Sequence, residues 1–243
     1  MPKLHLTKQY TMKILAIDTS TEACSTALYC GGEIISRHQL APRKHGELVL
    51  PMLDELLAEA GISTQQLDAV AFGRGPGSFT GLRIAAGVTQ GLAFAADLPV
   101  VPVSTLTALA QGIWRETGAV KVLPSLDARL QEVYWSACQL GENNLMSPVI
   151  DESVCAAGEV CVPDGEGWQG GGSGWDTYSD VLLNRCGVHC EKWLPGYFPH
   201  ASDIALLAVV AFERGETVSA EYAVPIYLRD NVASKPTSAV VTK

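Results

Sequence analysis

The sequence predicts an α/β protein built from two related lobes. Short apolar runs typical of buried strands alternate with longer segments whose apolar residues recur at helical spacing. The segments 14–30 and 122–138 (ILAIDTSTEACSTALYC and VLPSLDARLQEVYWSAC) share one pattern: a strand, an aspartate, a short turn and a second strand. This weak internal repeat indicates that both lobes open with a hairpin. The 243 residues, 47% of them hydrophobic, are enough to bury a substantial core.

The first half of the chain is predicted to open with an antiparallel meander and to continue as alternating strands and helices. The predicted strands cover 14–18, 24–30, 34–40, 67–72 and 99–103. The predicted helices cover 45–60, about 78–96, and a segment from a cap at 104 or 105 towards 112. Gly61 ends the first helix, and Pro51 should kink it because the proline ring removes a backbone donor.

The second half repeats the opening pattern and then becomes less regular. Its predicted elements are strands at 120–127 and 132–138, a helix at 201–215, and a short strand or extended segment at 225–233. Ser202 is the expected N-cap of that helix and Gly215 its C-cap. Residues 141–175 lack clear periodicity, and the Gly-rich run at 164–175 (DGEGWQGGGSGW) is predicted to be loop.

These elements set the expected domain boundaries. Residues 12–105 form the predicted first lobe, and residues 106–233 form the second. Residues 1–11 lack the apolar core and cleavage site of a signal peptide, so we treat them as an extension outside the fold. Residues 234–243 are expected to form a mobile tail.

The composition favours an acidic cytoplasmic protein. The formal net charge is −9, with 17 basic against 26 acidic side chains, so unaided RNA binding is not favoured without a local basic patch. Seven cysteines, an odd and scattered set, predict reduced thiols in place of a disulfide framework or a zinc site. No apolar run reaches about 18 residues, which predicts no transmembrane helix.

The stretch 72–87 (FGRGPGSFTGLRIAAG) has the glycines and hydroxyls of a phosphate-binding loop but not the spacing of one. A P-loop needs Lys and then Ser or Thr after its second glycine, whereas Gly81 is followed by Leu82 and Arg83. The dinucleotide pattern G-x-G-x-x-G also fails in both frames. The glycines are therefore predicted to allow a tight turn and close packing. The remaining candidates for cofactor or anion binding are Asp18, Thr19, Ser20, Ser78 and Thr80.

Small residues recur at every fourth position of the helix predicted at 78–96. Gly87, Gly91 and Ala95 fall on one face, where another helix can approach closely. The approaching helix belongs either to the same chain or to another subunit, and the sequence favours neither.

Catalytic motifs are missing from the sequence. His45 lies at a helix start, but a metal-binding pair on one helix face needs a second His four residues later, and that residue is Val49. No H-x-x-x-H and no G-x-S-x-G occurs in the chain.

Five segments, in order between residues 12 and 233, resemble one protein family. They are MKILAIDTSTEACSTALY, AFGRGPGSFTGLRIAAGVTQGLA, LPVVPVSTLTALAQG, DARLQEVYWSA and VPIYLRDNVA. Together they are similar to the TsaB (older name YeaZ) family of bacterial tRNA threonylcarbamoyladenosine biosynthesis proteins. The block GRGPGSFTGLR at 73–83 is its most specific marker, whereas residues 141–200 contribute little.

The resemblance implies a fold and a role. The fold is the two-lobed actin, sugar-kinase and Hsp70 type, a duplicated ribonuclease H-like architecture, here with a reduced second lobe. The role is that of a non-catalytic paralogue of TsaD, the subunit that transfers a threonylcarbamoyl group to N6 of adenosine 37 in tRNAs reading codons that begin with A.

The resemblance also implies partners. First-lobe helices would pair with a TsaD-like subunit, a TsaE-like ATPase would join them, and homodimers would form through a similar surface. ATP and metal are expected on the partner subunit, no cofactor on this chain, and tRNA contact only through the complex. The expected interface residues are His45, Leu48, Met52, Leu56, Arg83, Gly87, Gly91 and Phe94.

Two other functions are kept as alternatives. An ATP-dependent kinase or ATPase of the same superfamily is suggested by Asp18, Asp127 and the glycine runs at 73–81 and 170–174. A metallopeptidase, an old description of the wider family, finds no metal pair or triad spacing in the sequence.

Overall fold

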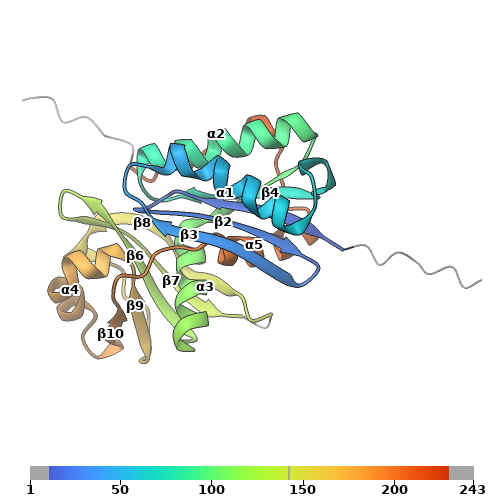
Figure 1. Cartoon of the computed structure of the whole chain (residues 1–243). Helices are drawn as coiled ribbons and strands as arrows, with labels where there is room; N and C mark the ends of the chain where they lie inside the picture. Colours follow the sequence, from blue (N-terminus) through green and yellow to red (C-terminus); the bar gives the residue numbers. More distant parts are fainter. Residues whose placement is uncertain (1–10, 142, 230–243) are drawn as a thin grey trace, which may run out of the picture.

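The computed structural model describes residues 11–141 and 143–229, which form two mixed five-stranded sheets (Figure 1). The expected extension and tail, residues 1–11 and 234–243, lie outside the described residues except for Thr11. The first sheet has the order β3-β2-β1-β4-β5. Its strands are β1 (Lys13–Asp18), β2 (Ala23–Cys30), β3 (Glu33–Leu40), β4 (Ala69–Gly75) and β5 (Val100–Ser104).

The second sheet repeats the topology of the first. Its order is β10-β9-β6-β7-β8, with the antiparallel meander on one side and two parallel strands on the other, as in the first sheet. Its strands are β6 (Lys121–Arg129), β7 (Glu132–Leu140), β8 (Met146–Ala156), β9 (Trp168–Gly171) and β10 (Cys190–Leu194). The predicted duplication is therefore confirmed at the level of the whole sheet.

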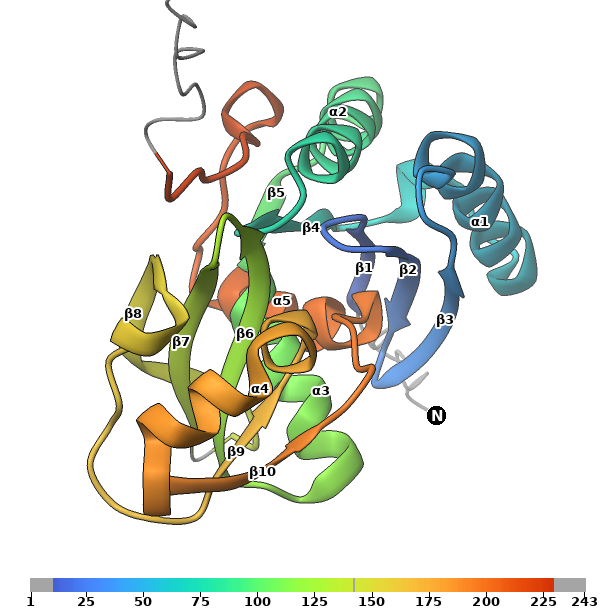
Figure 2. The ribbon, with the colours of Figure 1, turned by 90° about the vertical axis from the view of Figure 1, so that its left-hand side faces the viewer.

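Five α-helices cover the two sheets in layers. They are α1 (His45–Ala60), α2 (Phe79–Ala96), α3 (Thr105–Thr117), α4 (Ser173–Cys186) and α5 (Ala201–Glu213). Helices α1 and α2 cover the outer face of the first sheet, and α4 covers the outer face of the second. Helices α3 and α5 lie between the two sheets (Figure 2). No helix among the described residues is long and apolar enough to cross a membrane.

Short 3₁₀ turns complete the described chain. They are η1 (Thr64–Gln66), η2 (Ala157–Glu159), η3 (Gly187–His189) and η4 (Ala220–Tyr222). After η4 the chain follows α2: the Gln90 side-chain amide donates to the Ala223 carbonyl, and the Ile226 N–H donates to the Arg74 carbonyl. Of the segment expected to form a strand or extended piece at 225–233, the structure describes 225–229, and these residues form no strand.

The helix predictions are confirmed where the apolar period is strong. Helix α1 ends at Gly61, whose φ of 65° is the left-handed conformation that glycine adopts most readily, and the helix continues through Pro51 without interruption. The Ser104 hydroxyl caps α3 by accepting from the Thr107 N–H. This helix continues to Thr117, beyond the predicted end at Gly112.

The prediction of loop for the Gly-rich run at 164–175 was wrong, because β9 and the start of α4 lie within it, and the region 141–175 that showed no clear periodicity is more regular than expected. The region also contains β8, and the rest of α4 and all of β10, likewise missed, follow it. The four residues of β9, WQGG, are all buried between β6 and β10, so the surrounding sheet determines their conformation instead of their own propensity. The predicted N-cap of α5 was also wrong, because the helix begins at Ala201 and His200 holds the cap position without a side-chain hydrogen bond.

The expected boundary between the lobes does not hold for the last part of the chain. Residues 201–213 were assigned to the second lobe, yet α5 packs its Ile204, Ala205 and Ala208 against the first sheet. Val218 also bridges to Val100 of β5. The chain therefore forms the second sheet and then returns to complete the first lobe.

An ion pair between the exposed Arg115 and the buried Asp203 ties α3 to α5. The Arg115 guanidinium donates from Nε and Nη2 to the two carboxylate oxygens of Asp203, both at 3.1 Å, and Nη2 also donates to the Tyr197 hydroxyl at 3.0 Å. Asp203 is fully buried, and burial raises the pKa of its carboxyl while Arg115 opposes that rise. This pair joins the helix on the second sheet to the helix on the first.

Removing only the cation of this pair should destabilise the fold. Arg115→Met leaves the buried Asp203 carboxylate without its partner, and we expect unfolding to be easier by about 3 kcal/mol. Urea denaturation at pH 7 measures the loss. The double variant Arg115→Met/Asp203→Asn should recover part of it, because no buried charge remains; equal stability of the two variants would contradict the assigned cause.

Candidate functional site

The glycine-rich stretch after β4 is packed against the turn that follows β1. A Cβ on Gly73 would overlap the Asp18 carboxylate, and one on Gly81 would overlap the Thr19 carbonyl oxygen. The Thr19 hydroxyl in turn donates to the Gly81 carbonyl at 2.7 Å. A Cβ on Gly77 would meet the Ser20 backbone in the same way. The glycines thus allow close approach of two protein segments, as the sequence predicted, and the space of a phosphate cradle is filled by the chain itself.

The second lobe uses its own glycine run for the same purpose. Cβ atoms on Gly172 and Gly174 would overlap Ser125 in the middle of β6, and one on Gly170 would overlap the Trp175 ring. The Trp175 indole N–H donates to the Leu123 carbonyl at 2.7 Å. The two lobes therefore share a packing device as well as a sheet order.

Asp18, the expected phosphate-site aspartate, is fully buried. Its carboxylate accepts from the Ser20 N–H at 3.1 Å and from the Ser20 hydroxyl at 2.8 Å. Burial raises the pKa of Asp18 to about 7, and the hydrogen bonds from Ser20 oppose the rise only in part. The arrangement holds the turn before β2 and leaves no carboxylate oxygen facing solvent.

The other candidates for cofactor binding differ in exposure: Thr19 and Ser20 are buried, whereas Ser78 and Thr80 are exposed. The Thr19 hydroxyl donates to the Gly81 carbonyl of α2, and the Ser20 hydroxyl donates to Asp18 within the turn. The Ser78 hydroxyl accepts from the Gly81 N–H at 3.4 Å as the N-cap of α2. Thr80 is exposed in the first turn of α2. Only Ser20 and Ser78 of these line the cleft described next.

A cleft of about 700 Å³ lies between the two lobes. The first residues of α1, α2 and α4 reach it, so three helix N-termini face one space. His45, the first residue of α1, lines the cleft, is 7% exposed, and has no hydrogen-bond partner for its Nε2 among the described residues. Arg43 and Arg129, from different lobes, also line it. Sequence reasoning missed both arginines, because the fold alone brings them together.

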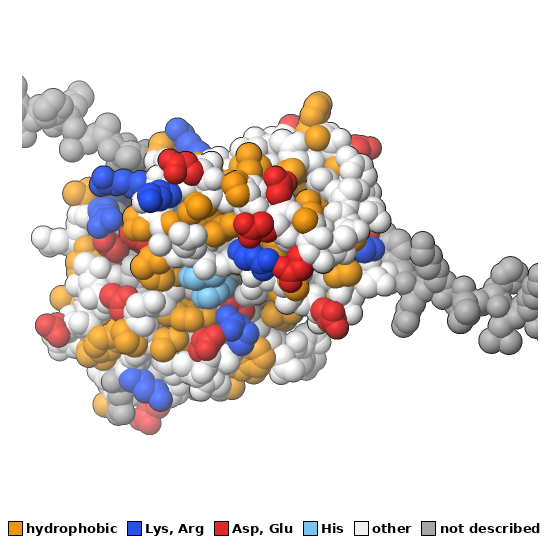
Figure 3. Space-filling view, viewed as in Figure 1, with side chains coloured by type: hydrophobic (Ala, Val, Ile, Leu, Met, Phe, Trp, Pro, Cys, Tyr) orange, Lys and Arg blue, Asp and Glu red, His pale blue; other side chains and the backbone are white. Residues whose placement is uncertain are grey.

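The outer face of α2 is open and apolar. A Cβ on Gly87 or Gly91 would meet nothing within 4 Å outside the helix backbone, and Phe94, on the same face, is 82% exposed. Figure 3 shows hydrophobic side chains gathered over α1 and α2. The small-residue face therefore points away from the protein, and packing within the described chain does not use it.

The expected interface residues of α1 are placed differently. Met52 and Leu56 are buried in the core beneath α1 and face the sheet, whereas Leu48 packs against that core and is only partly buried. His45 faces the cleft. The physical reason is the helix period, which turns positions 49, 52, 53 and 56 inward together. Of the eight expected residues, Arg83, Gly87, Gly91 and Phe94 are exposed.

Comparison with known proteins gives a consistent picture. The family model described as "TsaD: tRNA N6-adenosine threonylcarbamoyltransferase" matches residues 33–170. Two relatives, both called tRNA threonylcarbamoyladenosine biosynthesis protein TsaB, come from Escherichia coli (44% identical, covering 92% of this chain and 97% of the relative) and Haemophilus influenzae (42% identical, covering 92% and 96%).

Two solved structures match closely as well. A Pseudomonas aeruginosa protein described as similar to peptidase YEAZ is 46% identical, with a TM-score of 0.84 over 90% of this chain and all of that one. A structure of YeaZ from Pseudomonas aeruginosa is 45% identical, with a TM-score of 0.83 over 89% of this chain and all of that one. From the repeated sheets, the packed glycine block and these likenesses, the chain belongs to the TsaB (YeaZ) family.

Proposed function

We propose that this chain is a non-catalytic subunit in the biosynthesis of threonylcarbamoyladenosine in tRNA, and that it binds and activates a TsaD-like catalytic subunit. The names of its relatives support the pathway. The observation that carries the subunit role is the outer face of α2, where Gly87, Gly91 and Phe94 are exposed on one side of a well-packed helix. A monomer has no structural need for such an apolar, small-residue face.

The geometry supports a binding function over an ATP-dependent enzyme. Asp18 and Thr19, the residues expected to meet a phosphate, are buried and satisfied by the turn and by α2. Gly73 and Gly81 are in van der Waals contact with that turn, so a nucleotide phosphate could enter only by displacing it. We infer that a TsaE-like ATPase and tRNA join the complex through the TsaD-like subunit or its junction with this chain, in the cytoplasm, on tRNAs reading codons that begin with A.

Reconstitution of the modification tests this function. Purified TsaD-like and TsaE-like subunits, the threonylcarbamoyl adenylate and unmodified tRNA are combined with and without this chain. We expect modified tRNA to accumulate only when the chain is present. Formation at the same rate without it would show that the proposed role is wrong.

A bulky residue on the α2 face should block the partner. Gly87→Leu places a side chain where a partner helix must approach closely, and we expect binding of the TsaD-like subunit, or of a second copy of this chain, to weaken at least about tenfold. Gly87→Ala, which adds one methyl in open space, is the matched control and should bind normally. Analytical ultracentrifugation measures both; equal affinities for the two variants would refute the helix-face contact.

A further inference from the structure

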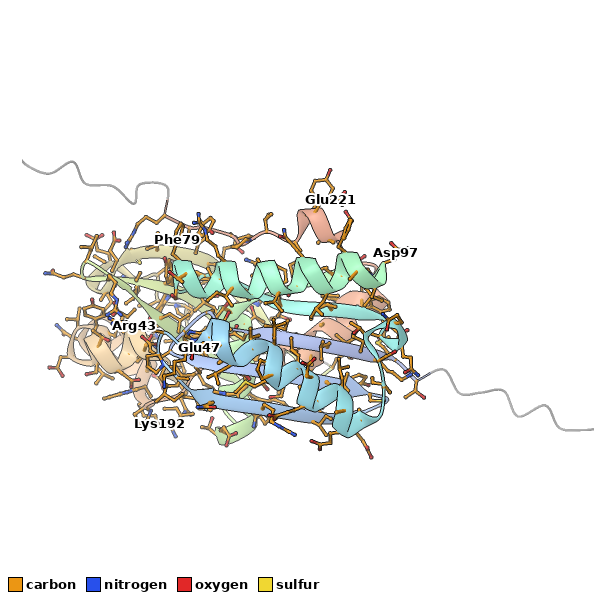
Figure 4. The ribbon with its side chains drawn as sticks, turned by 45° about the horizontal axis from the view of Figure 1, so that its top comes forward. Arg43, Glu47, Phe79, Asp97, Lys192 and Glu221 are labelled. Carbon is orange, nitrogen blue, oxygen red and sulfur yellow. The ribbon has the colours of Figure 1, made fainter. Side chains whose placement is uncertain are left out.

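Four arginines and two aromatic residues form one surface at the mouth of the cleft, where α1 and α2 begin. We call it the arginine–aromatic surface, and it consists of Arg43, Phe79, Arg83, Arg129, Tyr227 and Arg229. Figure 3 shows Lys and Arg side chains gathered at this end of the molecule. Figure 4 shows Arg43 and Phe79 at the starts of α1 and α2. The chain as a whole carries a net charge of −9, so this gathering of cations is local.

The aromatic part of the surface is preassembled. The rings of Phe79 and Tyr227 lie 5.3 Å apart, tilted by 43°, and they are 46% and 43% exposed by residue. The Arg83 guanidinium lies 3.8 Å from the Phe79 ring centroid, and its Nε donates to the Tyr227 hydroxyl at 3.2 Å. These contacts hold the rings in place while about half of each residue stays in solvent, as a stacking platform requires.

The charges of the surface are only partly neutralised. Arg129 pairs with Asp127 at 3.0 Å, and Arg229 pairs with Glu132. Glu22 also lines the cleft and lies 3.9 Å from Arg129. Arg43 and Arg83 form no salt bridge with any residue that the structure describes. An excess of positive charge therefore remains.

The hairpin turn between β6 and β7 places Arg129 at the mouth of the cleft. Arg129, Leu130 and Gln131 have φ angles of 64°, 56° and 64°, three successive left-handed residues without a glycine among them. Positive φ at Leu130 and Gln131 is what a two-residue hairpin turn requires, although it is more costly without glycine. Leu130 at its tip is 82% exposed, so burial of that side chain does not explain the turn.

We propose that the arginine–aromatic surface binds a single-stranded loop of RNA, with the arginines on phosphates and the rings of Phe79 and Tyr227 against a base. This inference rests on the proposed function, which supplies tRNA as the substrate. Guanidinium groups match phosphate geometry, and aromatic faces stack on unpaired bases. The core of a protein interface is depleted in charged residues, whereas here an excess of arginines lies beside the partly exposed rings, an arrangement that complements a polyanion.

Equilibrium binding of a tRNA transcript to the complex of this chain with its TsaD-like partner tests the inference, at salt concentrations between 50 and 200 mM. Arg43→Gln/Arg129→Gln should weaken binding about tenfold and lower the slope of log affinity against log salt by about 1 to 2, because two phosphate contacts are lost. Phe79→Leu should weaken binding about fivefold with the slope unchanged, because it removes stacking without removing charge.

The control is Arg214→Gln, which removes an exposed arginine just after α5 and should change neither affinity nor slope. Wild-type affinity and slope in the double variant would overturn the inference. So would loss of TsaD-like capture with tRNA binding intact, which would mark a protein interface, or displacement of tRNA by millimolar ATP, which would mark a nucleotide site. Any of these leaves the reconstitution result, and with it the proposed function, unaffected.

Discussion

Gly81→Ala should destabilise the protein by about 3 kcal/mol, the upper end of the usual cost of overpacking. The added Cβ would overlap the carbonyl oxygen of Thr19, and the Thr19 hydroxyl already donates to the Gly81 carbonyl, so two backbone segments would have to separate. Neither segment can yield easily, since β1 lies at the centre of its sheet and α2 is packed on that sheet. Losses of this size come from overpacking in a rigid core. Thermal and urea denaturation measure the change.

The matched control lies six residues later on the same helix. Gly87→Ala adds the same methyl group where nothing lies within 4 Å, and alanine has the better helix propensity. We therefore expect Gly87→Ala to stabilise the protein by about 0.5 to 1 kcal/mol. If both variants change stability alike, close packing of α2 on the β1 turn is not the reason for the glycine at position 81.

The contrast between these two glycines shows what the sequence could and could not predict. The GRGPGSFTGLR block predicted a turn and close packing, and the structure confirms this through Gly73 and Gly81. Periodic segments such as α1 and α2 were predicted almost to the residue. The strand β9 was missed, because two of its four residues are glycines and its conformation depends on β6 and β10, which are distant in sequence.

The candidate sites show the same difference: features set by local periodicity could be predicted, and features that join distant segments could not. The open face of α2 could be predicted, since a four-residue period places Gly87, Gly91 and Phe94 close together on a helix. The helix period also predicts that Met52 and Leu56 face the core, whereas the family resemblance implied that they lie at an interface. The arginine–aromatic surface could not be predicted, because it joins residues 43, 79, 129 and 227 through contacts between lobes.

Asp18→Asn should change how stability depends on pH. The pKa of Asp18 is about 7 in the folded chain against an ordinary 3.8, because burial disfavours the charged carboxylate. Below pH 3.8 the group is protonated in both the folded and the unfolded chain, and its ionisation costs nothing. Between pH 4 and 7 the unfolded chain releases the proton while the folded chain keeps it, so stability falls as the pH rises; above pH 7 the full cost, about 4 kcal/mol, is present.

Asparagine cannot ionise, so the variant escapes this loss. Its amide can still accept from the Ser20 N–H, but it adds a buried donor, which lowers stability equally at every pH by about 1 to 2 kcal/mol. The free energy of unfolding of Asp18→Asn relative to the wild type should therefore rise by about 4 kcal/mol from pH 4 to pH 8, and urea denaturation across that range measures it. Asp54→Asn, at an exposed position of α1, controls for the loss of one negative charge and should leave the wild-type pH dependence unchanged. A constant difference between Asp18→Asn and the wild type would mean that Asp18 is ionised in the folded protein at pH 4. In that case the β1 turn would hold a buried carboxylate that the hydrogen bonds from Ser20 are enough to stabilise.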